Sequence, residues 1–168
     1  MTASALTIRA AVEADLPSVV TIYNEAILRR IATADLEPQK LEARRAWFAN
    51  RDHATRPVLV ALDHEGVCAW GSYTSFKERS AYAPTAEISV YVANRAAGQG
   101  VGRAMLDALL ERAPACGIDH ILALCFLHNE ASLRLFRSRG FTEWGTLPEV
   151  CDLEGVRRSV VILGRALS

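Results

Sequence analysis

The chain has few cysteines and no excess of either charge. Its four cysteines form no C-x-x-C pair, and no histidine stands at a metal-ligand spacing from any of them. We therefore expect reduced thiols, with no disulfide and no metal site. Nineteen basic residues balance nineteen acidic ones. The charge thus gives no reason to expect nucleic acid or an anionic membrane as a partner.

The chain also lacks long hydrophobic runs. No run approaches the roughly 18 apolar residues that cross a bilayer, and residues 1–10 contain no apolar signal segment or cleavage site. We expect a cytoplasmic protein. There is no linker, repeat or low-complexity segment either, and 51% of the 168 residues are hydrophobic. These properties predict a single domain over residues 1–168, with a core large enough to fold without disulfides.

Hydrophobic periodicity predicts a mixed α/β domain. Alternating or continuous apolar runs predict strands at residues 6–9, 58–62, 67–76, 86–92, 121–126, 141–145 and 159–163. Apolar residues three or four apart predict helices that begin after Asp15, near Leu41, at residues 98–102 and at Asn129. Asp15 is expected to cap the first helix and Gly140 to end the last. The order is β-α-α-β-β-β-α-β-α-β-β, in one mixed unit.

A glycine-rich turn is the most informative stretch. Ala97-Gly98-Gln99-Gly100-Val101-Gly102 lies between an apolar strand and an amphipathic helix. Alternate glycines let the backbone turn sharply and approach a ligand, and the free N–H groups at a helix start favour a phosphate. A tight turn without a ligand is the alternative. The missing Lys-Ser or Lys-Thr excludes a P-loop, and the absence of G-x-G-x-x-G spacing argues against a dinucleotide site.

This turn resembles the pattern Gln/Arg-x-x-Gly-x-Gly/Ala, the acetyl-coenzyme A signature of the GNAT N-acetyltransferases. Other segments resemble, in the same order, the phosphinothricin / methionine sulfoximine acetyltransferase subgroup. They include Ile22-Tyr23-Asn24-Glu25-Ala26, Arg45-Ala46-Trp47-Phe48, Ser89-Val90-Tyr91-Val92, Asn129-Glu130-Ala131-Ser132 and Arg139-Gly140-Phe141. The resemblance runs from about Ile8 to Val150, most of the chain. It implies the GNAT fold, a central, twisted, mostly antiparallel sheet that is splayed at the acetyl-CoA site and flanked by helices.

By this resemblance, acetyl-CoA lies in the splay beside the strand that carries Val90, Tyr91 and Val92. The main chain of Val90 and Val92 would hold the pantetheine arm and polarise the thioester carbonyl. The pyrophosphate would lie on the turn and the start of the helix, on residues Gly98, Gln99, Gly100, Val101, Gly102 and Arg103. Asn129 and Ser132 would contact the cofactor as well, although Asn129 also suits a plain helix N-cap.

The resemblance also assigns the general base to Glu87. An ammonium has no lone pair, so acyl transfer requires a group that removes a proton from the amine. On an alternating strand Glu87 shares a face with Ser89 and Tyr91, while Ile88, Val90 and Val92 face the other way. A charged residue that faces solvent at a strand end is the alternative.

Phe76, Arg79 and Tyr82 match the loop with which subgroup members face an amino-acid-like substrate. The planar fork of an Arg side chain binds both oxygens of a carboxylate or phosphinate. For Arg79 an ordinary exposed loop charge is the alternative. A second group of arginines, Arg134, Arg137 and Arg139, is expected on a solvated face near a helix C-terminus.

Several residues depart from the family pattern, and three of them concern the cofactor and the catalytic step. Ala97 stands where the signature begins with Arg or Gln, and Arg95 is the residue that could reach the phosphates instead. Ile88 replaces a polar residue beside the base. Phe136 stands at the position of the suggested general acid, and it cannot donate a proton. A thiolate with a conjugate-acid pKa of about 8.5 can leave without that help, so the proton donor stays unassigned.

Together these features predict an N-acetyltransferase for a small primary amine, such as phosphinothricin, methionine sulfone or methionine sulfoximine. We expect direct attack without an acyl-enzyme, because Cys125, the cysteine nearest the expected cleft, has no paired His. Acetylation of a protein N-terminus or a polyamine, and a coenzyme A-binding module without catalysis, are the alternatives. Family members often pair, so the chain is expected to form a homodimer.

Overall fold

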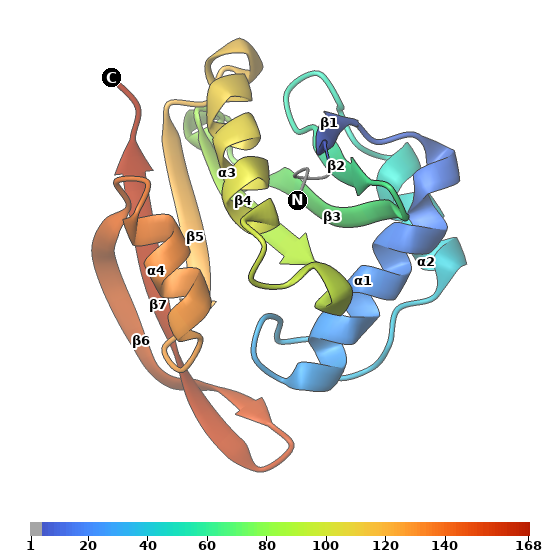
Figure 1. The fold of residues 1–168 in the computed structure, drawn as a ribbon. Helices are drawn as coiled ribbons and strands as arrows, with labels where there is room; N and C mark the ends of the chain where they lie inside the picture. Colours follow the sequence, from blue (N-terminus) through green and yellow to red (C-terminus); the bar gives the residue numbers. More distant parts are fainter. Residues whose placement is uncertain (1–4) are drawn as a thin grey trace.

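The protein, described over residues 5–168 by a computed structural model, is built on a seven-stranded sheet in the order β1-β2-β3-β4-β5-β7-β6 (Figure 1). The strands are β1 (Thr7–Ala10), β2 (Val58–Asp63), β3 (Gly66–Ser75), β4 (Thr85–Val92), β5 (His120–Phe126), β6 (Thr142–Leu153) and β7 (Val156–Ala166). Neighbouring strands run antiparallel except β4 and β5, which run parallel. The predicted mixed α/β architecture with a mostly antiparallel sheet is confirmed.

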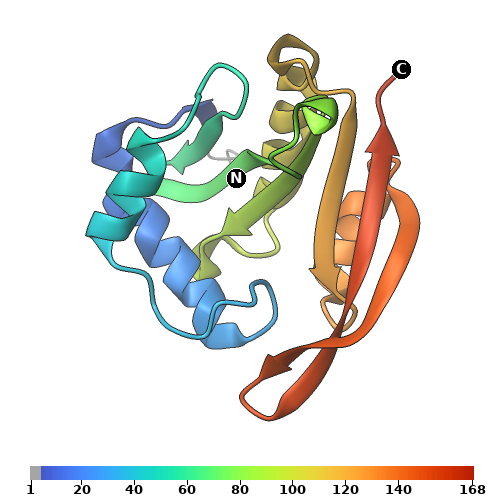
Figure 2. The same cartoon turned by 180° about the vertical axis from the view of Figure 1, so that it is seen from behind.

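Four helices cover the sheet and divide the core in two. One core lies under α1 (Leu16–Arg29) and α2 (Leu41–Ala49), where it includes Ile22 and Trp70. The other lies under α3 (Val101–Arg112) and α4 (Glu130–Arg137), where it includes Met105 and Phe136. Figure 2 shows α1 and α2 in front of the first strands, and α4 behind β5 and β7. The two helix pairs therefore pack on opposite faces of the sheet, and none of the helices within residues 5–168 is long and apolar enough to cross a membrane.

The parallel pair at the centre of the sheet is short. β4 and β5 pair only at Thr85–His120, Ala86–Ile121 and Glu87–Leu122. On its other side β4 stays paired with β3 as far as Val92. The sheet is therefore continuous up to Glu87 and opens beyond it, which leaves one edge of β4 without a strand partner from residue 88 onward.

The last two strands are much longer than the predicted segments 141–145 and 159–163. Two register shifts in β6, at Glu143/Gly145 and Leu147/Cys151, break its alternation, and Pro148 lies within the second. A bulge sets two residues opposite one, and proline cannot donate to the ladder, so the sequence pattern is that of a loop. As an edge strand, β6 tolerates both features.

Asp15 is the N-cap residue of α1, as expected, but the prediction that its side chain caps the helix is wrong. Its side chain makes no capping hydrogen bond to α1. One carboxylate oxygen instead accepts from Arg9 at 2.7 Å and from the backbone N–H of Val12 at 2.8 Å. The bond from Arg9 contributes most to holding the pKa of this carboxyl below its usual range, although partial burial opposes it. Asp15 thus ties β1 to the start of α1.

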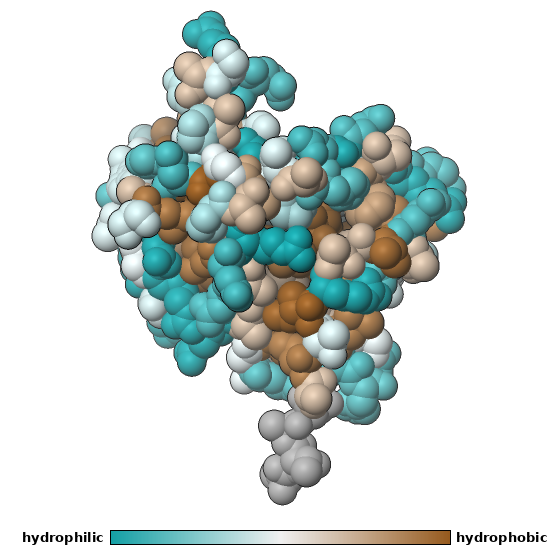
Figure 3. Space-filling model, turned by 90° about the horizontal axis from the view of Figure 1, so that it is seen from above, coloured by the Kyte–Doolittle hydropathy of each residue, from teal (hydrophilic) through white to brown (hydrophobic). Residues whose placement is uncertain are grey.

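One face of the C-terminal strands carries exposed apolar side chains. Leu124 on β5, and Trp144 and Leu147 on β6, are between 39% and 48% exposed. Figure 2 shows that no helix covers this face of β5, β7 and β6, which lies opposite α4. At the end of the molecule seen in Figure 3, by contrast, hydrophobic residues are interspersed with hydrophilic ones. The uncovered sheet face is thus a candidate contact surface.

Candidate active site

A cleft of about 630 Å³ opens beside the unpaired end of β4. The end of β4, the glycine turn, the start of α3, one side of α4 and the residues after α1 form its walls. Most residues predicted to bind the cofactor line it, namely Val90, Tyr91, Val92, Gly98, Gly100, Val101, Gly102, Arg103, Asn129 and Ser132. Gln99 does not. The structure thus brings together main-chain and side-chain groups that are up to 42 positions apart.

The glycine turn presents open backbone to the cleft. Gly98 and Gly100 have backbone φ angles of 74° and 80°. Residues other than glycine adopt such angles only with steric strain. A Cβ at either position would meet nothing within 4 Å. Gly100 is the N-cap of α3 and offers no side chain, so the first N–H groups of α3 have no capping side chain. The positive end of the α3 dipole therefore faces a space that suits a phosphate.

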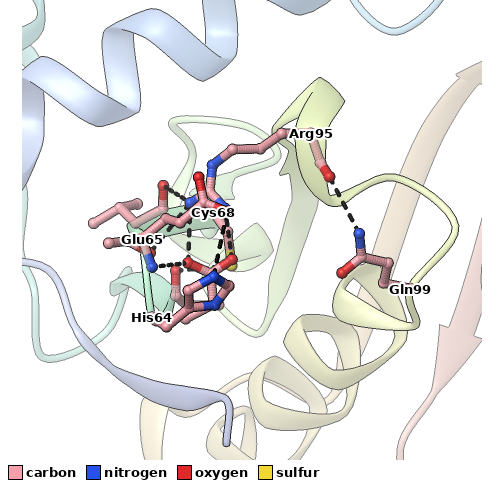
Figure 4. A network of polar contacts seen from close by, with 9 residues as sticks. His64, Glu65, Cys68, Arg95 and Gln99 are labelled. Atoms are coloured by element: carbon pink, nitrogen blue, oxygen red, sulfur yellow. Dashed lines mark hydrogen bonds and ion pairs between the residues drawn. The ribbon is translucent and has the colours of Figure 1, made fainter. Parts of the chain in front are cut away.

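Arg95 does not reach the turn, contrary to the role considered for it. Its guanidinium binds Asp63 at the end of β2, with N–O distances of 2.6 and 3.1 Å. Gln99 is exposed, and its amide donates to the Arg95 carbonyl at 3.2 Å (Figure 4). Both side chains therefore help to hold the segment that leads into the glycine turn. Arg95 does not supply the phosphate contact that the Arg or Gln of the family pattern would make at position 97.

Asn129 is the N-cap of α4. Its side-chain oxygen accepts from the Ser132 N–H at 3.1 Å. Its amide nitrogen donates to the carbonyl of Ile31, also at 3.1 Å. His128, the preceding residue, lies 3.3 Å from the carbonyl of Arg30. The buried Asn129 side chain thus joins the segment after α1 to the start of α4, and together they close one side of the cleft.

Glu87 lies where the sheet opens. It is the last residue of β4 that pairs with β5, and it faces Leu122 across that pair. The side chain is half-buried, and burial raises the pKa of its carboxyl. It makes no hydrogen bond or ion pair with another side chain of residues 5–168. A carboxylate in this position is free to accept a proton, and its raised pKa makes it a stronger base than an exposed glutamate.

Aromatic side chains pack around Tyr91, on the face of β4 that also carries Glu87. The ring of Tyr91 lies 5.1 Å from that of Tyr23 and 4.9 Å from that of Trp70. The buried guanidinium of Arg44 stacks over Tyr23 at 4.7 Å. The Tyr23 hydroxyl contacts Asp35, and burial, followed by this carboxylate, raises the pKa of Tyr23 to about 12. Arg44 gave no sequence signal, because an arginine next to Arg45 on a short helix is usually a solvated charge.

The predicted substrate loop leads into β4 from the Glu87 end. The rings of Phe76 and Tyr82 meet edge to face with centroids 5.7 Å apart. Arg56 fixes the loop by donating to the carbonyl of Ala83 at 2.7 Å. The side chain of Arg79 is exposed and has no hydrogen-bond or ion-pair partner in the part of the chain that the structure describes. None of the three predicted loop residues lines the large cleft, so they lie outside the region that would hold the cofactor.

Cys125 and Phe136 are buried in the core under α3 and α4. Burial, with a smaller effect of the Glu87 charge, raises the pKa of the Cys125 thiol to about 12. The ring of Phe136 packs on Phe141 with centroids 5.1 Å apart. Cys125 therefore stays protonated at neutral pH and is a poor nucleophile. No group of His, Cys, Asp and Glu side chains within residues 5–168 forms a metal site.

The three arginines expected on a solvated face have different surroundings. Arg139 binds Asp107 at 2.9 Å, and Arg137 lies 3.9 Å from Glu143. Arg134 lines the cleft. Sequence reasoning grouped the three because they share one helix end, and it had no means of telling which side of the helix meets α3.

Comparison with known proteins gives consistent matches. Residues 20–141 match the family model of the Acetyltransferase (GNAT) family. The YwnH protein of Bacillus subtilis is 44% identical over 97% of this chain and 100% of its own. An L-methionine sulfoximine/L-methionine sulfone acetyltransferase of Pseudomonas aeruginosa is 39% identical over 85% of this chain and 84% of its own. The crystal structure of a phosphinothricin acetyltransferase from Sinorhizobium meliloti in complex with AcCoA has a TM-score of 0.92 at 30% identity, with 97% and 89% of the two chains covered.

The family match covers more than half of the chain, and the relatives match nearly its full length. The acetyl-CoA complex shares the fold in which the present cleft is built. The open glycine turn and the unpaired edge of β4 fit a ligand that carries phosphates and an amide-containing arm. The chain belongs to the GNAT acetyltransferase family and is an acetyl-CoA-dependent N-acetyltransferase.

Proposed function

We propose that this enzyme is cytoplasmic and acetylates the primary amine of small amino-acid-like substrates, with Glu87 as its general base. The observation that supports this most directly is the position of Glu87 at the point where β4 and β5 part. The carboxyl is half-buried, has a raised pKa and has no partner that would neutralise it among the described residues. Glu87 does not line the cleft itself, but it lies three residues before Val90, which does. An unpaired, partly desolvated carboxylate at the point where the sheet opens suits removal of a proton from an amine.

In the proposed reaction the acetyl thioester lies along the unpaired edge of β4. Backbone N–H groups near Val90 and Val92 polarise its carbonyl, which stabilises the oxyanion that develops there. Glu87 takes a proton from the ammonium, directly or through water, and the neutral amine attacks the carbonyl carbon. The C–N bond forms, the C–S bond breaks and the sulfur leaves as a thiolate. The attacking nitrogen loses its second proton to water, and the thiolate takes a proton from water, so that the products are the amide and the thiol of coenzyme A. No acyl-enzyme is involved, because the Cys125 thiol is buried and protonated.

The side chains of the β3–β4 loop favour an acceptor substrate that carries an acidic group. Phe76 and Tyr82 form an aromatic pair, and the unpaired Arg79 lies between them in sequence. An arginine fork suits the carboxylate of an amino acid or a phosphinate. Phosphinothricin and methionine sulfoximine or sulfone, the compounds in the names of two relatives, are amino acids with a carboxylate next to the amine. We therefore propose compounds of this kind as acceptors.

A thiol-release assay with acetyl-CoA and a panel of amines tests the proposal. The panel contains phosphinothricin, methionine sulfone, methionine sulfoximine, the decarboxylated amine of methionine sulfone, spermidine and an N-terminal peptide. We expect release with the first three and little with the others. Turnover confined to spermidine or to the peptide would contradict the proposed substrate class. Glu87→Gln should abolish most turnover with each active amine while calorimetric binding of coenzyme A stays unchanged.

We also propose that the enzyme forms a homodimer through the uncovered face of β5, β7 and β6. The exposed apolar side chains of Leu124, Trp144 and Leu147 on this face support the proposal. Water contact with such a sheet face is unfavourable, and a second copy of the same face can remove it.

A further inference from the structure

The charged side chains that line the cleft are all arginines. They are Arg29, Arg103 and Arg134, and no Asp or Glu of the described chain lines the cleft with them. The whole sequence carries equal numbers of acidic and basic residues. The lining of the cleft therefore has a local excess of positive charge, which favours a ligand with several negative groups.

Two of these arginines lie on the same wall. Arg103 is in the first turn of α3, beside the glycine turn, and Arg134 is on α4. The helices meet directly between them, because a Cβ on Gly102 would lie 3.6 Å from the side chain of Leu135. Figure 1 shows α3 and α4 on the same side of the sheet. Arg29 comes from the end of α1 and belongs to a different wall.

Arg134 differs from the two arginines that follow it, Arg137 at the end of α4 and Arg139 just after it, in having no partner among residues 5–168. Arg137 has Glu143 and Arg139 has Asp107. Arg134 makes no ion pair or side-chain hydrogen bond with any residue between 5 and 168. A guanidinium presents several N–H donors in a planar fork that matches phosphate oxygens. Arg134 is therefore available to an anion in the cleft.

The covalent structure of coenzyme A narrows the choice of anion. Its pyrophosphate and its 3′-phosphate are attached to the same ribose. A side chain that binds the 3′-phosphate must therefore lie close to the groups that bind the pyrophosphate. Arg103 lies beside the turn proposed for the pyrophosphate, and Arg134 is its neighbour across the α3–α4 contact.

We propose that Arg134 binds the 3′-phosphate of coenzyme A and so selects it over 3′-dephospho-coenzyme A. This inference rests on the proposed placement of acetyl-CoA in the cleft. Arg103 then serves the pyrophosphate, which both compounds share. The roles of the two arginines can be separated experimentally, since only Arg134 contacts the 3′-phosphate that 3′-dephospho-coenzyme A lacks.

Isothermal titration calorimetry with coenzyme A and with 3′-dephospho-coenzyme A tests the assignment without relying on turnover. Arg134→Ala should raise the Kd of coenzyme A about tenfold, the effect expected for one charge-assisted contact. It should leave the Kd of 3′-dephospho-coenzyme A nearly unchanged. Arg103→Ala should weaken both ligands. Arg137→Ala is the matched control on the same helix and should weaken neither.

Equal losses for the two ligands in Arg134→Ala would overturn the proposal, because they would place Arg134 on the adenine or the pyrophosphate. Equal affinity of the wild-type protein for both ligands would overturn it as well. Failure of the wild-type protein to bind coenzyme A at all would overturn the placement of the cofactor together with this inference. A melting temperature for each variant shows whether it is folded under the conditions of the titration.

Discussion

Glu87 combines a proposed catalytic role with an unfavourable location for a charge. Burial raises its pKa in the folded protein, so the folded state binds this proton more tightly than the unfolded state does. Ionisation of Glu87 therefore lowers the free energy of unfolding as the pH rises through the folded-state pKa. Glu87→Gln should reduce kcat by about a hundredfold or more. The variant protein should melt at pH 8 at a temperature no lower than that of the wild type, because it has no buried negative charge at position 87.

The pH dependence separates this role from a structural one. Wild-type kcat/KM should fall on the acid side as Glu87 becomes protonated, at a pH above the ordinary glutamate pKa. A residual activity of Glu87→Gln should not show this acid limb. A clear drop in melting temperature at pH 8, or an unchanged acid limb in the variant, would assign Glu87 a structural role instead.

Cys125 is the natural suspect for a covalent intermediate, and its surroundings argue against one. Its thiol pKa is raised to about 12, so almost none is thiolate at neutral pH. Cys125→Ala should keep kcat within a few-fold of wild type, although it removes a buried sulfur and should lower the free energy of unfolding by about 1 kcal/mol. Mass spectrometry of wild-type protein quenched during turnover should show no acetyl group on Cys125. Acetyl-cysteine at that position would refute direct attack.

The residues of the site differ in how far the sequence could predict them. The glycines and Asn129 stand just before a helix start, so a linear pattern locates them, whereas Glu87 was assigned by the resemblance to the family. Arg134 was placed on a solvated face, because its helix end explains a cation there without any ligand. Its place in the cleft depends on the packing of α4 against α3, and this long-range contact has no local signal.

At the scale of elements, the turn between β6 and β7 makes a clear prediction. Glu154 and Gly155 both have positive φ, 55° and 90°, as a two-residue hairpin turn of type I′ requires. The Gly155 N–H donates to Asp152 at 2.6 Å. Gly155→Ala should lower the free energy of unfolding by about 1 kcal/mol, because an L side chain is strained there. Urea denaturation followed by far-UV circular dichroism gives the value.

Gly145, in the same hairpin, supplies the control. Its φ is not in the left-handed region, and a Cβ there would meet nothing closer than 4.0 Å. Gly145→Ala should therefore be neutral or slightly stabilising, since glycine weakens a strand. Equal effects of the two substitutions would show that the turn does not depend on the glycine conformation.

The same hairpin shows why the sequence located elements better than it located their ends. A Glu-Gly turn is a weaker signal than Asn-Gly, and the bulges around Pro148 remove the alternation that marks a strand. The pattern therefore ended the strands early. The ion pair of Glu154 with Arg30, at 2.8 Å, joins two segments 124 residues apart. This long-range contact explains why Glu stands at position 154, although the type I′ turn by itself favours Asn there.

At the scale of the whole molecule, the resemblance predicted the opening of the sheet, and local pattern alone would not have done so. β4 and β5 both read as ordinary buried strands along their full length. They part after Glu87 and Leu122, and the opening is lined by residues of α1, α3 and α4 as well as of β4. The cleft is therefore a property of the assembled fold. Beyond it, the C-terminal strands are covered by a helix, α4, on one face only (Figure 2).

That uncovered face leads to a prediction about assembly. If two copies bury Leu124, Trp144 and Leu147 against each other, light scattering coupled to size exclusion should give about twice the chain mass of 18.4 kDa. Leu124→Glu should shift the enzyme towards the monomer mass, because a charge on this face would lose its hydration in the dimer. Leu28→Glu is the matched control, since Leu28 is 73% exposed on α1, away from these strands. A monomeric wild-type protein would contradict the homodimer. A dimer that Leu124→Glu leaves intact would mean that the two copies meet on a different surface. A dimer sensitive only to Leu124→Glu would mean that the face left open by the splayed sheet is the surface on which the protein pairs.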